Sequence, residues 1–131
     1  MFQYKTEVYY EDTDAGGVVY YANYLKFIER ARTNLIQNLG FTLNQLTSDF
    51  DSIFVVRKIN CEYLAPAKLE DELIVKTKIL EIKNASFTLS QDIEKSEKII
   101  FSSKILMVCI NSAGKPIKIP TSLSVLLHEN I

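Results

Sequence analysis

The sequence predicts an α+β domain in which one antiparallel sheet of five or six strands wraps around one long helix. Apolar residues recur every three or four positions between residues 23 and 39, which indicates a long amphipathic helix. After residue 52 apolar and polar residues alternate over several segments joined by short turns, which indicates consecutive antiparallel strands. A helix set apart from such a run of strands is typical of the α+β class.

The length and charge of the chain limit its function. A chain of 131 residues suffices for one modest core, so we predict a single domain over residues 1–131. The formal net charge of -1 argues against the basic surface that nucleic-acid binding needs, and we expect no nucleic-acid partner. No apolar run reaches the roughly 20 residues that span a bilayer, and the N-terminus lacks the apolar core of a signal peptide. We therefore expect a cytoplasmic protein without a membrane span.

The first half of the chain is expected to contain one strand and the long helix. Alternation predicts a strand over residues 2–10, with Tyr10 on its apolar face. The helix is predicted over Asn23–Leu39, with Asn23 as its N-cap and Gly40 as its stop. Residues 41–52 read as a polar connection with a short helical turn.

The second half is expected to form the rest of the sheet. We predict strands over residues 53–64, 72–83, 86–94, 99–110 and 115–119, and a brief helix over residues 123–127. A single sheet around one helix leaves an edge strand and some apolar outer face uncovered, so we expect self-association.

Outside residues 9–24, few side chains in the sequence are able to take part in catalysis or bind a metal. Cys61 and Cys109 lie in apolar alternating runs and are expected to be buried, reduced thiols. The one histidine, His128, is near the C-terminus and is expected on the surface.

Residues 9–24, which we call the acidic loop, join the first strand to the helix. They contain three acids, Glu11, Asp12 and Asp14, with two adjacent glycines and five tyrosines. The spacing of Asp12 and Asp14 matches the start of a calcium-binding loop. The fifth position is glycine, however, the twelfth is Asn23 instead of glutamate, and a strand precedes the loop. We therefore expect no metal here.

A solvated turn is the simplest alternative for the acidic loop, but two features favour a functional one. Gly16 and Gly17 allow a positive φ and close approach of a ligand, and large apolar residues follow them. We expect Asp14 to lie near the helix N-terminus. A carboxylate there can act as base or nucleophile, while free N–H groups of the first helical turn stabilise an oxyanion. These are the parts needed for acyl transfer to water.

The acidic loop also resembles a known family. Residues 9–20, Ala22-x-Tyr24 and residues 29–33 resemble the signature of hotdog-fold acyl-CoA thioesterases. The similar branch includes 4-hydroxybenzoyl-CoA thioesterase and the bacterial Tol-Pal-associated thioesterases, and residues 54–58 and 62–71 resemble the latter subgroup. The match is collinear over almost the whole chain. It implies a hotdog fold, an acyl-CoA substrate, no cofactor, and active sites at the interface of a homodimer that often forms a dimer of dimers.

The resemblance also implies roles for particular residues. Asp14 matches the catalytic carboxylate, as nucleophile or general base, and the backbone N–H of Tyr21 matches the group that polarises the thioester carbonyl. The Tol-Pal-associated subgroup usually has histidine at the Tyr21 position, so a side-chain role of that histidine does not transfer, and acyl preference stays open. The expected substrate-binding residues, including those for the phosphates of coenzyme A, are Gly16, Gly17, Lys83, Ser86, Lys115 and Lys118, followed by Arg57 and Lys58.

Two other functions remain as alternatives. One is a module or scaffold that binds acyl-CoA or acyl carrier protein with little turnover. The other is a hotdog dehydratase or hydratase, which is less favoured because those enzymes use a histidine near the central helix and this chain has none there.

Overall fold

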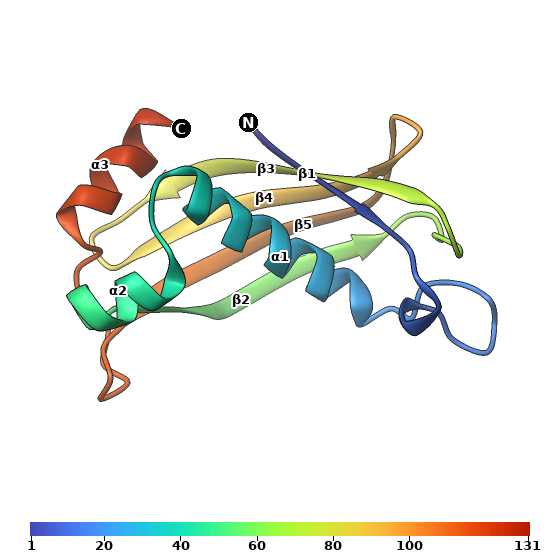
Figure 1. The fold of residues 1–131 in the computed structure, drawn as a ribbon. Helices are drawn as coiled ribbons and strands as arrows, with labels where there is room; N and C mark the ends of the chain where they lie inside the picture. The colour runs from blue at the N-terminus through green and yellow to red at the C-terminus, as the bar shows by residue number, and fades with distance from the viewer.

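The computed structural model describes residues 1–131 and consists of one antiparallel sheet with a long helix across one face (Figure 1). The five strands lie in the order β1-β3-β4-β5-β2, and helix α1 spans Asn23–Asn38. The predicted α+β arrangement of a sheet around one helix is confirmed. The strands are β1 (Phe2–Glu7), β2 (Ile53–Tyr63), β3 (Glu72–Ile82), β4 (Ser86–Lys95) and β5 (Lys98–Ile110). The shorter helices are η1 (Tyr10–Asp12), α2 (Leu43–Phe50) and α3 (Thr121–Glu129).

The strand register defines two ends of the sheet. Ile53 of β2 lies opposite Ile110 of β5, and Ser86 of β4 pairs with Val108 nearby, at what we call the Ser86 end. Tyr63 lies opposite Phe101, at what we call the Tyr63 end. The chain enters α1 at the Tyr63 end, whereas α2 and α3 lie toward the Ser86 end (Figure 1).

The core lies between α1 and the inner face of the sheet. Alternate residues of β3 and β4 are buried beneath the apolar stripe of α1, as period-two strands packed on an amphipathic helix require. Each such apolar side chain contributes about 1.5–3 kcal/mol by burial. The largest fully buried side chains are Phe27, Ile28, Leu35, Leu46, Leu73, Leu89, Ile93, Phe101, Ile105, Ile119, Leu123 and Leu127.

One buried polar residue ties α1 to the sheet. The fully buried amide of Gln91 donates from Nε2 to the carbonyl of Ile28 at 2.9 Å and to Thr77 Oγ1 at 3.0 Å. Its Oε1 accepts a hydrogen bond from Arg32 Nη1 at 3.3 Å. Because an unpaired buried amide would be costly, these bonds fix the position of α1 along the sheet.

The first predicted strand and the helix N-cap differ in the structure. β1 ends at Glu7. Val8 N–H still donates to Asp71 O at 3.0 Å in the register of the β1–β3 pair, but Tyr9 N–H turns away to Asp12 Oδ2 at 2.9 Å, so the ladder stops. Tyr10 is therefore exposed and lies in η1. Asn23 is the first residue of α1 instead of its N-cap, because its side chain donates to the backbone carbonyl of Asp12 at 2.9 Å.

The C-terminal end of α1 follows the prediction, and the next segment is more helical than expected. Gly40 has a φ of 98°, and the N–H of Phe41 reaches back to Ile36 O at 3.2 Å. This is the left-handed stop that glycine favours. Residues 43–50 form a full helix instead of a short turn, with the Thr42 side chain accepting from Gln45 N at 3.0 Å.

The last predicted strand does not form. Pro116 has no N–H, and its one bridge, to Ile110, is isolated. The neighbouring N–H groups bond to two different segments: Ile117 to Cys109 O at 2.9 Å, and Ile119 to Asn84 O at 3.0 Å. No single ladder can therefore continue. The helix that follows, α3, is longer than predicted, at nine residues.

The outer surface of the sheet is mixed. The outward positions of β4 are polar, among them Thr88 and Ser90, whereas Val55 of β2 and Leu80 of β3 are exposed apolar side chains, so some apolar surface is uncovered as expected. Cys109 is buried as predicted, but Cys61 is only partly buried. His128 is exposed, as expected. None of the helices is long and apolar enough to cross a membrane.

Candidate active site

The acidic loop folds back on itself and closes onto residues 65–71. Thr13 and Val19 form an antiparallel bridge, and the N–H of Asp14 donates to Val18 O at 3.0 Å. Val19 N–H then donates to Ala67 O at 2.8 Å. The loop is thus a tight hairpin attached to the segment before β3, rather than a freely solvated turn.

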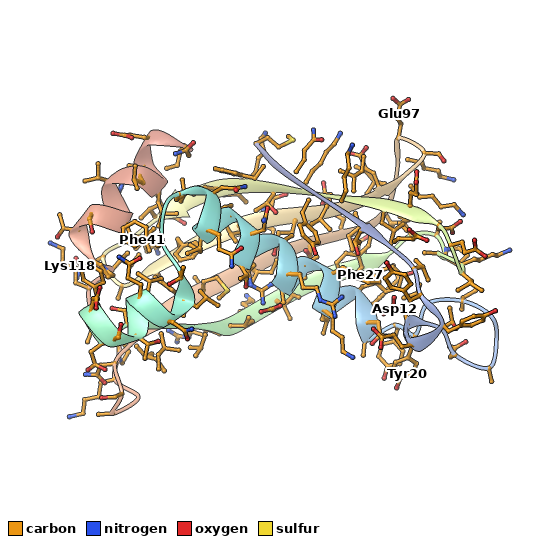
Figure 2. All side chains as sticks on the ribbon, viewed as in Figure 1. Asp12, Tyr20, Phe27, Phe41, Glu97 and Lys118 are labelled. Atoms are coloured by element: carbon orange, nitrogen blue, oxygen red, sulfur yellow. The ribbon has the colours of Figure 1, made fainter.

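Asp12 holds the base of this hairpin. Its carboxylate is buried and accepts a hydrogen bond from Tyr9 N–H at 2.9 Å. Its backbone carbonyl accepts two more, from Tyr20 N–H and from the Asn23 side chain, both at 2.9 Å. Figure 2 shows Asp12 and Tyr20 together beside the start of α1. Glu11 is exposed and its side chain makes no hydrogen bond within the chain.

Asp14 differs from Asp12 because its side chain is exposed. Its Oδ1 accepts a hydrogen bond from Gly16 N–H at 2.8 Å, whereas Oδ2 has no donor within the chain. Gly17 has a φ of 79°, which closes the turn and favours glycine. No three His, Cys, Asp or Glu side chains come together here or elsewhere as a possible metal site. One oxygen of Asp14 is therefore oriented, and the other is free to contact water or substrate.

The entry to α1 provides an unpaired backbone donor. The N–H of Tyr20 is bonded to Asp12 O, and the N–H of Asn23 to Tyr20 O at 2.8 Å. Between them, the N–H of Tyr21 donates to no acceptor in the chain. Free N–H groups at a helix start carry partial positive charge and can stabilise an oxyanion. The predicted donor thus follows directly after the hairpin that carries Asp14.

A cluster of aromatic side chains surrounds this entry. The Tyr63 hydroxyl donates to Tyr21 O at 2.9 Å, and the buried Tyr24 hydroxyl accepts from Ala67 N–H at 3.1 Å. The rings of Tyr24 and Phe101 stack with centroids 5.3 Å apart. Burial raises the pKa of Tyr24, so its hydroxyl stays neutral.

The predicted coenzyme A residues are elsewhere. Lys83 and Ser86 line a pocket of about 250 Å³ at the Ser86 end, together with Lys58, Lys104 and one acid, Glu81. Arg57 is exposed at the bulge in β2 and is not part of this pocket.

The other two predicted lysines are also at the Ser86 end but outside that pocket. Lys115 is in the turn after β5, where its N–H donates to Asn111 Oδ1 at 3.0 Å. Lys118 lies in the following tail, which contacts the β3–β4 turn through the bond from Ile119 N–H to Asn84 O. Figure 2 shows Lys118 at the end of the molecule opposite Asp12.

The structure therefore separates the two halves of the predicted site within one chain. The acidic loop lies at the Tyr63 end, and Lys83 and Ser86 lie at the other end of the sheet. Strand β2, whose eleven residues connect these ends, is roughly 33 Å long at the usual rise per residue.

A second, mostly apolar cavity lies between these ends. It has a volume of about 120 Å³ and is bounded by α1, α2 and the inner face of the sheet. Arg32 and Glu29 of α1 are among the residues that line this cavity, and burial lowers the pKa of Arg32. Its other main lining residues are Leu35, Ile36, Leu43, Phe54, Val56, Phe87, Leu89 and Met107.

Comparison with known proteins places the chain in a family. The family model described as thioesterase superfamily matches residues 16–100, which include Gly16 and Gly17. The chain belongs to the thioesterase superfamily. Two curated relatives extend the match over most of its length. The acyl-CoA thioesterase YbgC of Haemophilus influenzae is 37% identical, over 98% of this chain and 95% of its own. The acyl-CoA thioester hydrolase YbgC of Escherichia coli O6:H1 is 40% identical, over 94% and 92%.

A solved structure agrees with this membership. The structure of a probable thioesterase from Bartonella henselae superposes with a TM-score of 0.88 at 35% identity, covering 90% of this chain and 98% of its own. The predicted hotdog thioesterase fold is confirmed, and the YbgC relatives agree with the predicted Tol-Pal-associated subgroup.

Three residues of this thioesterase have roles in the site that the sequence does not predict. Asn23 bonds to the Asp12 carbonyl instead of capping the helix, and Tyr63 bonds to the Tyr21 carbonyl. Lys104 lines the pocket with Lys83, and its one sequence signal is the alternation in β5, which places it on the outer face with Ser102. No local signal identifies the contact of Tyr63 with Tyr21, because it depends on where the end of β2 meets the acidic loop.

Proposed function

We propose that this protein is an acyl-CoA thioesterase that releases a free acid and coenzyme A without a metal or organic cofactor. The observation that carries the proposal is the acidic loop, which has an exposed Asp14 carboxylate in its hairpin and an unpaired Tyr21 N–H directly after it. Membership of the thioesterase superfamily and the two YbgC relatives support it.

Two routes lead from this geometry to the products. As a general base, Asp14 removes a proton from water, whose oxygen bonds to the thioester carbon; the carbonyl oxygen becomes an oxyanion that accepts from Tyr21 N–H. The C–S bond then breaks, and the thiolate leaves and takes up a proton. As a nucleophile, Asp14 itself displaces the thiolate, and water hydrolyses the resulting anhydride. One turnover in ¹⁸O-water distinguishes them, because only the second route can label Asp14.

We also infer that the working unit is a homodimer joined along β2. This strand is an edge of the sheet, with unpaired backbone groups and exposed apolar side chains at Ile53, Val55 and Val56. Pairing two copies of β2 antiparallel brings the Tyr63 end of one chain to the Ser86 end of the other. Asp14 would then share a site with Lys83 of the partner subunit, which accounts for their separation within one chain.

In this dimer the basic pocket has a defined task. Lys83 and Ser86, with Lys58 and Lys104 beside them, would bind the phosphates of coenzyme A whose thioester reaches the partner's acidic loop. Gly16 and Gly17 allow the substrate to approach the loop backbone. Lys115 and Lys118 extend the positive charge along the adjoining tail.

We also propose further association of the dimer, a location in the cell and a carrier substrate. A dimer of dimers rests on the family resemblance. We propose a cytoplasmic location. Acyl carrier protein presents the same thioester, and we propose it as a second substrate or partner.

The proposal is tested with short-chain, long-chain and aromatic acyl-CoA, measuring release of free thiol. We expect turnover of at least one class, and the panel also establishes acyl preference, which Tyr21 in place of the usual histidine leaves open. Binding of acyl-CoA without thiol release across the panel would overturn the hydrolase and favour the binding module.

A further inference from the structure

Tyr63, the last residue of β2, contacts the entry to α1 from across the fold. Its hydroxyl donates to the backbone carbonyl of Tyr21 at 2.9 Å, linking residues 42 positions apart in the chain. The ring is about half exposed, at 46%, and packs edge-on against Phe101 and Tyr24, with centroids 5.2 and 5.4 Å away. Packing on the sheet therefore determines where the hydroxyl lies.

This hydrogen bond completes the restraint on the peptide groups around Tyr21. The peptide that contains the Tyr21 N–H begins at the carbonyl of Tyr20, which accepts from Asn23 N–H at 2.8 Å. The next peptide begins at the carbonyl of Tyr21, which accepts from the Tyr63 hydroxyl. With one bond on each side, the direction of the unpaired Tyr21 N–H is set.

The Tyr63 hydroxyl remains a donor at neutral pH. Partial burial, followed by the neighbouring Cys61 thiol, raises the pKa of Tyr63 above its ordinary value. The hydroxyl therefore keeps its proton at neutral pH.

We propose that Tyr63 is a positioning residue for thioester hydrolysis, which aims the Tyr21 N–H at the oxyanion through its bond to the Tyr21 carbonyl. This inference rests on the proposed function. A backbone donor stabilises the transition state only when it is directed at the developing charge, and a small misplacement costs rate rather than substrate affinity. Tyr63 contributes through this geometry and need not touch the substrate.

The test compares Tyr63→Phe, which removes only the hydroxyl, with Tyr4→Phe. Tyr4 is a partly buried tyrosine of β1 whose hydroxyl makes no hydrogen bond within the chain. For Tyr63→Phe we expect kcat to fall roughly tenfold or more. KM for acyl-CoA and the affinity for free coenzyme A, which has no thioester carbonyl, should stay near wild type. The Tyr4→Phe protein should keep the wild-type kcat.

Two outcomes would overturn this role while leaving the proposed function intact. One is an active wild type whose Tyr63→Phe variant has an unchanged kcat. The other is a parallel loss of kcat, coenzyme A affinity and melting temperature in that variant, which would indicate a structural residue. Absence of turnover in the wild type would instead refute the proposed function and this role together.

Discussion

The backbone N–H of Gly16 donates to Oδ1 of Asp14 at 2.8 Å, and this bond orients the carboxylate that we propose for catalysis. The buried Asp12, two residues earlier, uses its carboxylate to hold the hairpin together. Two acids of the acidic loop therefore have different roles: Asp12 is structural, whereas Asp14 is exposed and can contact the reactants.

Replacing Asp14 by asparagine should abolish turnover without unfolding the protein. The amide oxygen can still accept from Gly16 N–H, but the side chain can neither remove a proton nor attack a thioester. We expect kcat to fall by roughly 10²–10⁴-fold. Glu11→Gln is the matched control, because Glu11 is exposed and makes no side-chain hydrogen bond. Thiol release and circular dichroism would check both variants. Unimpaired turnover in Asp14→Asn would refute the assignment.

The two glycines beside Asp14 should respond differently to alanine. A Cβ at Gly16 would lie 3.1 Å from Asp14 Oδ1, so Gly16→Ala should displace the carboxylate and lower kcat. A Cβ at Gly17 would meet nothing within 4 Å, but the φ of 79° is left-handed. Gly17→Ala should therefore lower the free energy of unfolding, by about 1–2 kcal/mol. Measurements of kcat and of urea unfolding on both variants separate the two effects. Equal losses of kcat and of unfolding free energy in the two variants would contradict the prediction.

Mixed dimers should reveal that each site draws on two chains. Asp14→Asn and Lys83→Glu homodimers should each have impaired turnover. In a mixed dimer one site combines the intact Asp14 of one chain with Lys83 of the partner subunit. Coexpression in equal amounts should therefore restore about a quarter of wild-type activity if chains pair at random and impaired sites contribute little. A mixture of Asp14→Asn with Asp14→Ala should restore none. Failure of the first mixture to gain activity would place each site within one chain.

The segment beneath the acidic loop should weaken in acid. Partial burial tends to raise the pKa of Asp71, but the Lys95 ammonium at 2.7 Å and Lys68 N–H lower it overall. A lowered carboxyl pKa stabilises the fold above the unfolded value, and the contribution is lost as pH falls through the folded value. The melting-temperature difference between wild type and Asp71→Asn should thus be largest near neutrality, begin to shrink near about pH 4, and vanish only below the lowered pKa of folded Asp71.

A control for this pH dependence is Asp92→Asn, because Asp92 has no ion pair or side-chain hydrogen bond within the chain. Its melting temperature should follow the wild-type pH profile. A difference between Asp71→Asn and wild type that stayed constant from neutral to acid pH would show that the carboxylate charge is not what stabilises this segment.

Much of the fold was predictable because hydrophobic periodicity is a local property. The stripe from Tyr24 to Leu35 indicated α1, and alternation indicated four of the five strands within one or two residues at each end. Errors arose where a hydrogen bond outside the regular ladder decided the local conformation. β1 stops where Tyr9 N–H bonds to the Asp12 carboxylate, and the tail around Pro116 divides its bonds between two segments.

The sequence by itself determined the fold class, the position of the acidic loop, and Asp14 as the acid to test. Only the tertiary structure decided that Asp12 is buried while Asp14 is exposed, and that Tyr63 reaches Tyr21. It also placed Lys83 at the opposite end of the sheet. The reason is physical: residue type and spacing govern helices, strands and turns, whereas these contacts depend on strand register and on how the acidic loop closes onto the sheet.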